Sequence, residues 1–195
     1  MVIFRGSVLY ILLLLLTSSL LVSVNCNVDE DTSKYGNLHL MKVLKARGHI
    51  VSNIVFETLL RVDRGTYLRP FTDSDPYVDS AVSIGDGATA SAPHMWAICL
   101  ELLKDNLVGA KRVLDVGSGT GYLTIAFGEI MSLDYATDDD DMVVVGIDSN
   151  EAVLRGAKEA VMSDRYHHKK WVDSGRVKFG MLLNPFYVMS SLIVH

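Results

Sequence analysis

The sequence is short of cysteine, proline and positive charge, and each shortage removes a class of protein. Two cysteines in 195 residues cannot build a disulfide scaffold. The 18 Lys and Arg against 23 Asp and Glu leave a net charge of −5, so we expect no binding along nucleic acid. At 49% hydrophobic and 21% charged residues, with only four prolines, the chain is too apolar to be disordered. One ordinary globular domain is the expectation.

The first 26 residues have the composition of a targeting segment. Arg5 supplies a basic start, an unbroken apolar run follows over 8–16, and small and polar residues come next. We interpret 1–26 as a signal peptide, which predicts the secretory pathway or the extracellular space, or as an uncleaved membrane anchor. The polar, acidic stretch 27–37 is then a linker.

Helical spacing of apolar residues dominates the next part of the chain. Three helices are expected: one over 38–45 before Gly48, one capped by Ser52 that ends near Asp63 and Arg64, and one over 93–104 from Pro93. In the third helix we expect these residues to face inward: Met95, Ile98, Leu102 and Leu103. The segment 69–89 is rich in turn residues and is expected to be irregular, which for so long a connection points to function.

After Gly109 strands and helices alternate. Apolar runs predict buried strands over 112–116, 142–147 and 176–179, and helical spacing returns over 123–131 and 150–162. Such alternation predicts a parallel sheet that binds its ligand at the carboxyl ends of the strands. The fold class is therefore α/β, a Rossmann-like sheet with an N-terminal helical segment.

The turn after the first of these strands carries the strongest chemical signal. Its glycines are Gly117, Gly119 and Gly121, and Tyr122 stands where a dinucleotide fingerprint has its third glycine, which argues against NAD. The helix that begins there is expected to offer unpaired N–H groups to a ligand carboxylate. Asp115 would point a carboxylate into the pocket, suiting an amine-bearing ligand, and Asp148 would accept hydrogen bonds from ribose hydroxyls. S-adenosylmethionine has all of these groups, and the pattern indicates a class I methyltransferase.

Four segments before the glycine turn indicate which family of class I methyltransferases the chain resembles. They are Val62-Asp63-Arg64-Gly65-Thr66-Tyr67, Pro76-Tyr77-Val78-Asp79-Ser80, Ser83-Ile84-Gly85 and Thr89-Ala90-Ser91-Ala92-Pro93-His94-Met95. Together with the glycine turn, and over residues 38–179, the chain closely resembles the protein-L-isoaspartate (D-aspartate) O-methyltransferases. The resemblance implies methyl transfer from S-adenosylmethionine to the carboxyl group of L-isoaspartyl and D-aspartyl residues in damaged proteins, and repair through collapse of the ester to a succinimide. It also implies isoaspartyl proteins as partners, a monomer, and a cytoplasmic location as the alternative to secretion.

The resemblance also assigns site residues. The family's essential serine falls on Ser91, and its cofactor contacts fall on Ala88, Thr89, Ala90, Ser91, His94, Ser118, Asp148 and Ser149. The residues themselves add these to the cofactor set: Asp115, Gly117, Ser118, Gly119 and Gly121. A carboxylate is already ionised at pH 7, so Ser91 would orient the reactants rather than abstract a proton. Without the resemblance, Ser91 is better explained as a helix N-cap and His94 as a hydrogen-bonded helix residue.

The chain departs from the family pattern after the third predicted strand. Gly180 and Met181 stand where the family has an Asp-Gly pair whose acid contacts adenine, and an apolar tail follows over 181–195. We therefore expect the methyltransferase domain over 38–180 to be a C-terminally truncated one with an incomplete sheet and an exposed strand edge. The alternative function is an inactive family member that binds cofactor or a partner.

Other polar clusters carry no site. The run Asp138 to Asp141 lacks the glycine and glutamate of a calcium loop, and His167 to Lys170 is expected on an exposed turn, so we predict no metal. Trp96 and Trp171 are expected to be packing residues.

Overall fold

The computed structural model describes residues 2–5, 8–11, 36–133, 142–164 and 168–181. Its helices are α1 (Gly36–Ala46), α2 (Asn53–Arg61), α3 (Arg64–Leu68), α4 (Pro93–Leu107), α5 (Tyr122–Met131), α6 (Glu151–Ser163) and α7 (His168–Asp173). Its strands are β1 (Val2–Arg5), β2 (Val8–Ile11), β3 (Val82–Gly85), β4 (Ala88–Ala90), β5 (Arg112–Val116), β6 (Val143–Asp148) and β7 (Val177–Met181).

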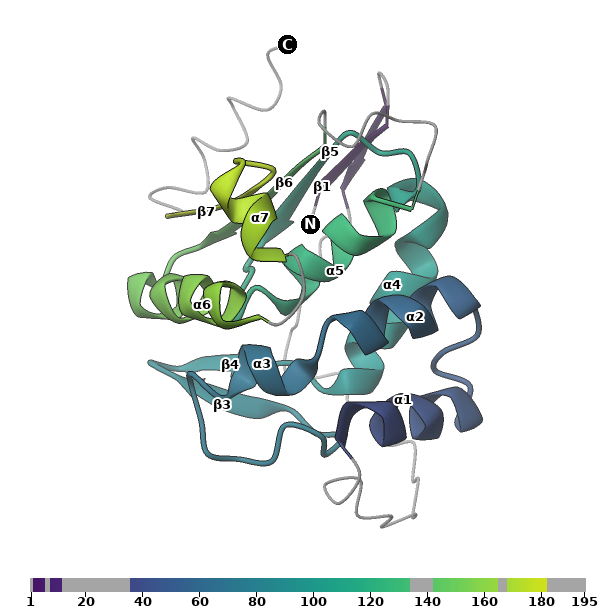
Figure 1. The fold of residues 1–195 in the computed structure, drawn as a ribbon, viewed down its shortest axis with the longest axis vertical. Helices are drawn as coiled ribbons and strands as arrows, with labels where there is room; N and C mark the ends of the chain where they lie inside the picture. Colours follow the sequence, from purple (N-terminus) through teal and green to yellow (C-terminus); the bar gives the residue numbers. More distant parts are fainter. Residues whose placement is uncertain (1, 6–7, 12–35, 134–141, 165–167, 182–195) are drawn as a thin grey trace.

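The main sheet has the strand order β2-β1-β5-β6-β7. Strands β5, β6 and β7 are parallel, with Asp115 opposite Gly146 and Gly146 opposite Phe179. Helices α5, α6 and α7 lie in front of this sheet in Figure 1, while α1 to α3 and the separate β3–β4 hairpin form the lower part of the view. The predicted α/β class and parallel sheet are confirmed.

Capping residues explain where several helices begin. The Ser52 hydroxyl accepts the Val55 N–H at the start of α2, as its type predicts, and the side-chain Oδ1 of Asn150 accepts the N–H groups of Ala152 and Val153 at the start of α6. Gly48 has a φ of +77°, the left-handed conformation that ends α1 without a steric penalty. One continuous core then runs from the N-terminal helices through α4 and α5 to β5 and β6.

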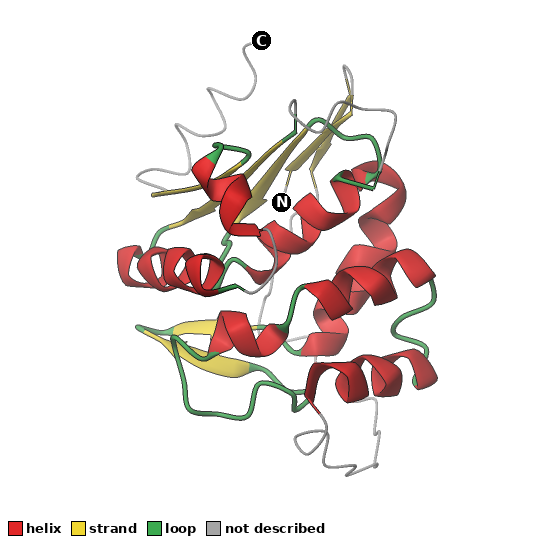
Figure 2. Ribbon diagram, viewed as in Figure 1, coloured by secondary structure: helices red, strands yellow, loops and turns green. Residues whose placement is uncertain are grey.

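The structure corrects four expectations. Residues 69–89 are not wholly irregular, because they contain β3 and β4, which stand apart from the main sheet in Figure 2. Helix α4 turns a different face inward: Leu103 is buried, but Met95, Ile98 and Leu102 are exposed. The edge of β5 is not open, since β1 pairs with it antiparallel, and residues of the expected targeting segment thus lie in the sheet. His168 lies in α7 and is fully buried, not on an exposed turn.

Candidate functional site

The glycine turn is fastened to the end of β6. The N–H groups of Gly117 and Ser118 both donate to the Ile147 carbonyl, at 2.8 and 3.1 Å, and the Gly119 N–H donates to Asp148 Oδ2 at 3.0 Å. The three glycines have φ between +54° and +80°, so a side chain at any of them would be strained. The N–H groups of Gly117, Ser118 and Gly119 are therefore already paired within the protein. The N–H groups in the first turn of α5, which the sequence predicts to face a ligand carboxylate, are a different set, and that prediction stays a prediction.

Asp115 is placed differently from the sequence expectation. Its side chain does not face an open pocket, because the residue is only 5% exposed and its Oδ2 accepts a hydrogen bond from Thr124 Oγ1 at 2.7 Å. Burial raises the pKa of this carboxyl and outweighs the opposing effect of the Thr124 hydrogen bond. Asp115 thus joins β5 to the first turn of α5 and sets the position of the turn between them.

Asp148 is the acidic group at the mouth of the site. Its Oδ1 accepts the Asn150 N–H and its Oδ2 accepts the Gly119 N–H, both at 3.0 Å. A carboxylate has further lone pairs beyond these two, so it can still accept hydrogen bonds from a ligand hydroxyl. The residue therefore remains suited to the ribose contact that the sequence predicts.

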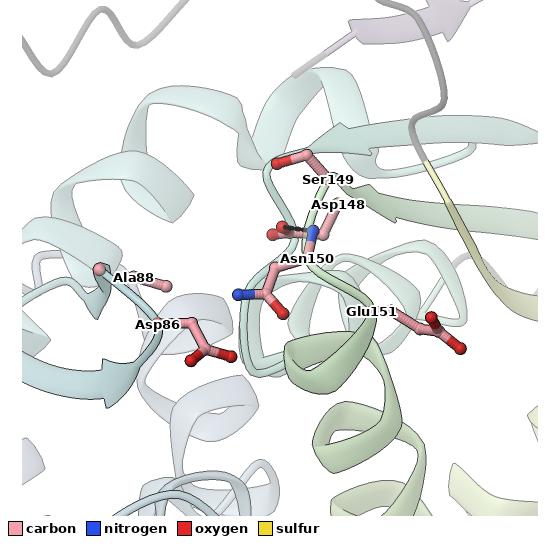
Figure 3. A pocket seen from close by; sticks show the side chains of 7 residues that line it. Asp86, Ala88, Asp148, Ser149, Asn150 and Glu151 are labelled. Carbon is pink, nitrogen blue, oxygen red and sulfur yellow. Dashed lines mark hydrogen bonds between the residues drawn. The ribbon is translucent and has the colours of Figure 1, made fainter.

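A cavity of about 540 Å³ opens beside Asp148. Its walls are the β3–β4 turn on one side and the β6–α6 connection on the other (Figure 3). The lining residues are Asp86, Gly87, Ala88, Asp148, Ser149, Asn150 and Glu151. Three predicted cofactor residues, Ala88, Asp148 and Ser149, are brought together here, although they come from segments sixty residues apart in the chain.

The remaining predicted residues do not line this cavity. Thr89 and Ala90 continue β4, and the half-buried Ser91 follows that strand. The N-cap of α4 is Ala92 and makes no side-chain hydrogen bond, so Ser91 is not the helix cap that its type alone suggested. The Ser91 carbonyl accepts a hydrogen bond from Arg64 Nη1 at 2.9 Å.

His94 faces an acidic residue of the preceding loop. Its N–H and its Nδ1 both lie within 3.0 Å of Asp79 Oδ1, and Arg47 lies 3.6 Å from the other oxygen of Asp79. The His49 ring is 5.4 Å from that of His94, and burial, together with the nearby His94, lowers the pKa of His49. Asp79 therefore fixes the orientation of the His94 ring, as the hydrogen-bonded interpretation of this histidine predicts.

Ser118 is a predicted site residue with a buried hydroxyl that lacks a hydrogen-bond partner among the described residues. The residue as a whole is 7% exposed. A buried hydroxyl without a partner costs free energy. It is therefore a polar atom in the glycine turn that a bound ligand could satisfy.

Sequence reasoning missed Asp86, Gly87, Asn150 and Glu151 as lining residues. Asp86 has a φ of +49°, the only non-glycine residue with positive φ in the described part of the chain, and stands between Gly85 and Gly87. A Gly-Asp-Gly sequence is a signal for a tight hairpin turn and could have placed these residues on a hairpin. Nothing comparable marks Glu151, whose place follows only from the direction of α6.

The other polar clusters have separate outcomes. Asp138 to Asp141 and His167 lie outside the described residues. Within the described ranges no group of three or more His, Cys, Asp or Glu could hold a metal ion. The packing roles expected of the tryptophans are confirmed: Trp96 is 7% exposed and stacks on Tyr122, and Trp171 is 3% exposed and lies against Gly128. None of the described helices is long and apolar enough to cross a membrane.

Known proteins resemble this chain over most of the described part. It is 40% identical over 131 residues to protein-L-isoaspartate O-methyltransferase 2 of Arabidopsis thaliana, covering 64% of this chain and 42% of the relative. It is 41% identical over 130 residues to the protein-L-isoaspartate O-methyltransferase of Triticum aestivum, covering 66% of this chain and 55% of the relative. The chain thus spans about half the length of these curated relatives.

A solved structure shares the fold. A crystal structure described as a Plasmodium falciparum protein-L-isoaspartate O-methyltransferase in complex with S-adenosyl-L-homocysteine superimposes with a TM-score of 0.66 at 32% identity, covering 74% of this chain and 62% of that one. The family model of protein-L-isoaspartate (D-aspartate) O-methyltransferases matches residues 35–181. The chain belongs to the protein-L-isoaspartate (D-aspartate) O-methyltransferase family.

Proposed function

We propose that this chain binds S-adenosylmethionine beside Asp148 and transfers its methyl group to the carboxyl group of L-isoaspartyl and D-aspartyl residues in damaged proteins. One observation carries the proposal: the cavity gathers Ala88, Asp148 and Ser149, the residues to which the family resemblance assigns cofactor contacts. The neighbouring structure from Plasmodium falciparum, described as a complex with S-adenosyl-L-homocysteine, supports the same ligand class.

The residues present fit this cofactor. Asp148 offers carboxylate lone pairs to ribose hydroxyls, and the unpartnered Ser118 Oγ offers a donor and an acceptor. Carboxylates at Asp86, Asp148 and Glu151 give the cavity a negative potential that favours a cationic ligand. When bound, the cofactor supplies an electrophilic methyl group on its sulfonium.

In this reaction the protein has to position the reactants, whereas it does not have to transfer a proton. A substrate carboxylate is already ionised at neutral pH, so its oxygen can attack without a strong base. Ser91, at the end of β4, would hold that carboxylate in line with the methyl group, and closure around the pair would strip water from the oxygen. The roles of Ser91, His94 and the glycine turn follow the family resemblance.

A second candidate is a family member that binds cofactor without turnover. Gly180 pairs with Ile147 across β6 and β7, so a residue without a side chain stands where the family resemblance expects an acid. Glycine has no side-chain acceptor, and an adenine contact from that position would be lost. This candidate predicts S-adenosyl-L-homocysteine binding with no methyl ester formed.

One experiment separates the candidates. The full chain is titrated with S-adenosyl-L-homocysteine by calorimetry and incubated with labelled S-adenosylmethionine and an isoaspartyl peptide. The Ser91→Ala variant tests the site, and Ser74→Ala, an exposed loop serine, is the matched control. Base-labile methyl ester that Ser91→Ala loses and Ser74→Ala keeps supports the enzyme. Binding without ester supports the second candidate, and absence of binding refutes both.

We also propose that residues 1–26 direct the chain to the secretory pathway and that the protein is a monomer acting on isoaspartyl proteins. The apolar run after Arg5 supports the first point, whereas the pairing of β1 with β5 requires a chain that keeps residues 2–5. N-terminal sequencing of the secreted and cytosolic fractions tests it, and a full-length cytosolic chain would contradict it. Light scattering on the eluted protein measures the oligomeric state.

A further inference from the structure

Arg64 is a fully buried charge that forms no ion pair with a carboxylate among the residues that the structure describes. The residue is 0% exposed. Burial lowers the pKa of Arg64 to about 10, which still leaves the guanidinium charged at neutral pH. Burying a charged side chain is unfavourable unless polar contacts compensate for the lost water. The contacts of the Arg64 guanidinium therefore indicate its structural role.

Those contacts join two separate segments beside the site. Nη1 donates to the Ser91 carbonyl at 2.9 Å, and Nη2 donates to the Ser80 carbonyl at 3.1 Å. Ser80 lies just before β3 and Ser91 just after β4, so the guanidinium connects the two ends of the hairpin. Asp79 and His94 make a second connection between the same segments.

A stack of rings continues from Arg64 to the glycine turn. The guanidinium carbon lies 4.4 Å from the ring centroid of Trp96, and Trp96 stacks on Tyr122 with ring centroids 4.2 Å apart and an interplanar angle of 25°. Tyr122 is the first residue of α5 and follows Gly121 directly. Arg64 therefore contacts the Ser91 segment on one side and, through two rings, the cofactor turn on the other.

We propose that Arg64 is a positioning residue that fixes the backbone of Ser91 relative to the glycine turn. The planar guanidinium suits this task, because one fork reaches two carbonyls while its central carbon lies over the Trp96 ring. A lysine would retain the charge but not the fork or the stacking surface. The expected effect of Arg64 on methyl transfer rests on the proposed function. Its effect on how firmly the Ser80 and Ser91 segments are held does not.

Hydrogen exchange on the full chain tests the structural part. In Arg64→Lys we expect amides in the hairpin segment 79–92 to exchange about tenfold faster or more, from the loss of charge-assisted hydrogen bonds, while β6 and α6 keep their wild-type rates. Arg155→Lys, an exposed arginine of α6, is the matched control and should exchange like wild type. Equal acceleration across the whole chain would indicate a merely structural role and overturn the proposal, as would no change.

Kinetics test the functional part. At saturating peptide and cofactor, Arg64→Lys should lower kcat about tenfold or more, with a smaller change in the affinity for S-adenosyl-L-homocysteine. A lysine variant with wild-type kcat would overturn the positioning role. If the wild type forms no methyl ester, the proposed function fails, and the exchange of 79–92 still decides whether Arg64 joins the two segments.

A second measurement, on the wild-type chain, tests the proposal even if Arg64→Lys does not fold. In the wild-type chain, amides next to Ser80 and next to Ser91 should exchange with the same opening free energy and the same dependence on low urea concentrations, because one side chain holds both. Two distinct opening free energies would overturn the proposal.

Discussion

His168 offers the sharpest test of how the N-terminal helices are held to the sheet. Its Nε2 lies 2.8 Å from Glu129 Oε1 and its Nδ1 lies 2.6 Å from Asp164 Oδ2, so both ring nitrogens donate to carboxylates and the ring is an imidazolium. Tyr67 of α3 donates to the same Asp164 oxygen at 2.7 Å, and Arg61 of α2 lies 3.3 Å from Glu129. One cation thus connects α5 and α6 to the N-terminal helices.

Replacing His168 by glutamine removes this cation and leaves two carboxylates behind. The side chains of Glu129 and Asp164 are 1% and 2% exposed, so water cannot compensate them. Removing one partner of a buried ion pair costs about 3–5 kcal/mol, which is the loss of unfolding free energy that we expect for His168→Gln at pH 6. Arg61 offsets little of it, because its side chain is 43% exposed.

The loss depends on pH in a definite direction. Burial by itself lowers the pKa of His168, but the hydrogen bonds to Asp164 and Glu129 outweigh it and raise the pKa above its usual value. A histidine whose folded pKa is raised contributes its full stability below the unfolded pKa of about 6.5 and loses it as the pH rises through the folded pKa. The difference between wild type and His168→Gln should therefore be largest near pH 6 and shrink toward pH 9.

Urea unfolding followed by the fluorescence of the buried tryptophans measures both quantities. Lys169→Gln changes the exposed neighbour in the same helix and should stay within about 0.5 kcal/mol of wild type. A His168→Gln variant within 1 kcal/mol of wild type at pH 6, or a difference that grows with pH, would refute the reasoning.

Three further predictions concern other parts of the fold. A Cβ at Gly146 would lie 2.8 Å from Thr124 Oγ1 and 2.9 Å from Ser118 Cβ. Gly146→Ala should therefore lower the unfolding free energy by about 1–3 kcal/mol and weaken S-adenosyl-L-homocysteine binding in calorimetry. A variant with unchanged stability and unchanged binding would contradict this prediction. Burial raises the pKa of Cys99 to about 12, so peptide mapping after alkylation at pH 8 should find Cys99 unmodified unless urea is present. Because β1 lies between β2 and β5, Ile3→Pro should remove a hydrogen bond between strands of the full-length chain. We expect faster hydrogen exchange in β5 and more aggregate in size-exclusion chromatography. An unchanged elution profile would count against the pairing of β1 with β5.

The sequence predicts the parallel strands β5, β6 and β7 because their signals are local, but it does not predict β1 and β2. The apolar run at 112–116 and the glycines after it define β5 and its turn without any knowledge of neighbours, and Ser52 and Gly48 mark helix ends by their own chemistry. The same holds for Asp148, which ends a buried strand and so must lie at the carboxyl edge of the sheet.

The orientation of α4 could not be predicted in this way. Met95, Ile98 and Leu102 form one apolar stripe at helical spacing, and Trp96, Leu100, Leu103 and Leu107 form another. Periodicity identifies the helix but cannot choose between two stripes of similar hydrophobicity. The second is buried because Trp96 must lie between Arg64 and Tyr122, a contact set by residues far away in the sequence.

The same limit explains why the buried contacts of His168 and Arg64 could not be predicted. Glu129 and His168 are 39 residues apart and Arg64 and Ser91 are 27 apart, so neither pairing leaves a spacing pattern in the sequence. In both cases a lone polar residue on a short helix looks like an exposed one until the fold buries it. A buried charge must find its partners in the folded chain, because leaving it unpaired costs more than most single contacts contribute. His168, which the sequence places on an exposed turn and the structure buries, is therefore a position at which this fold depends on distant partners.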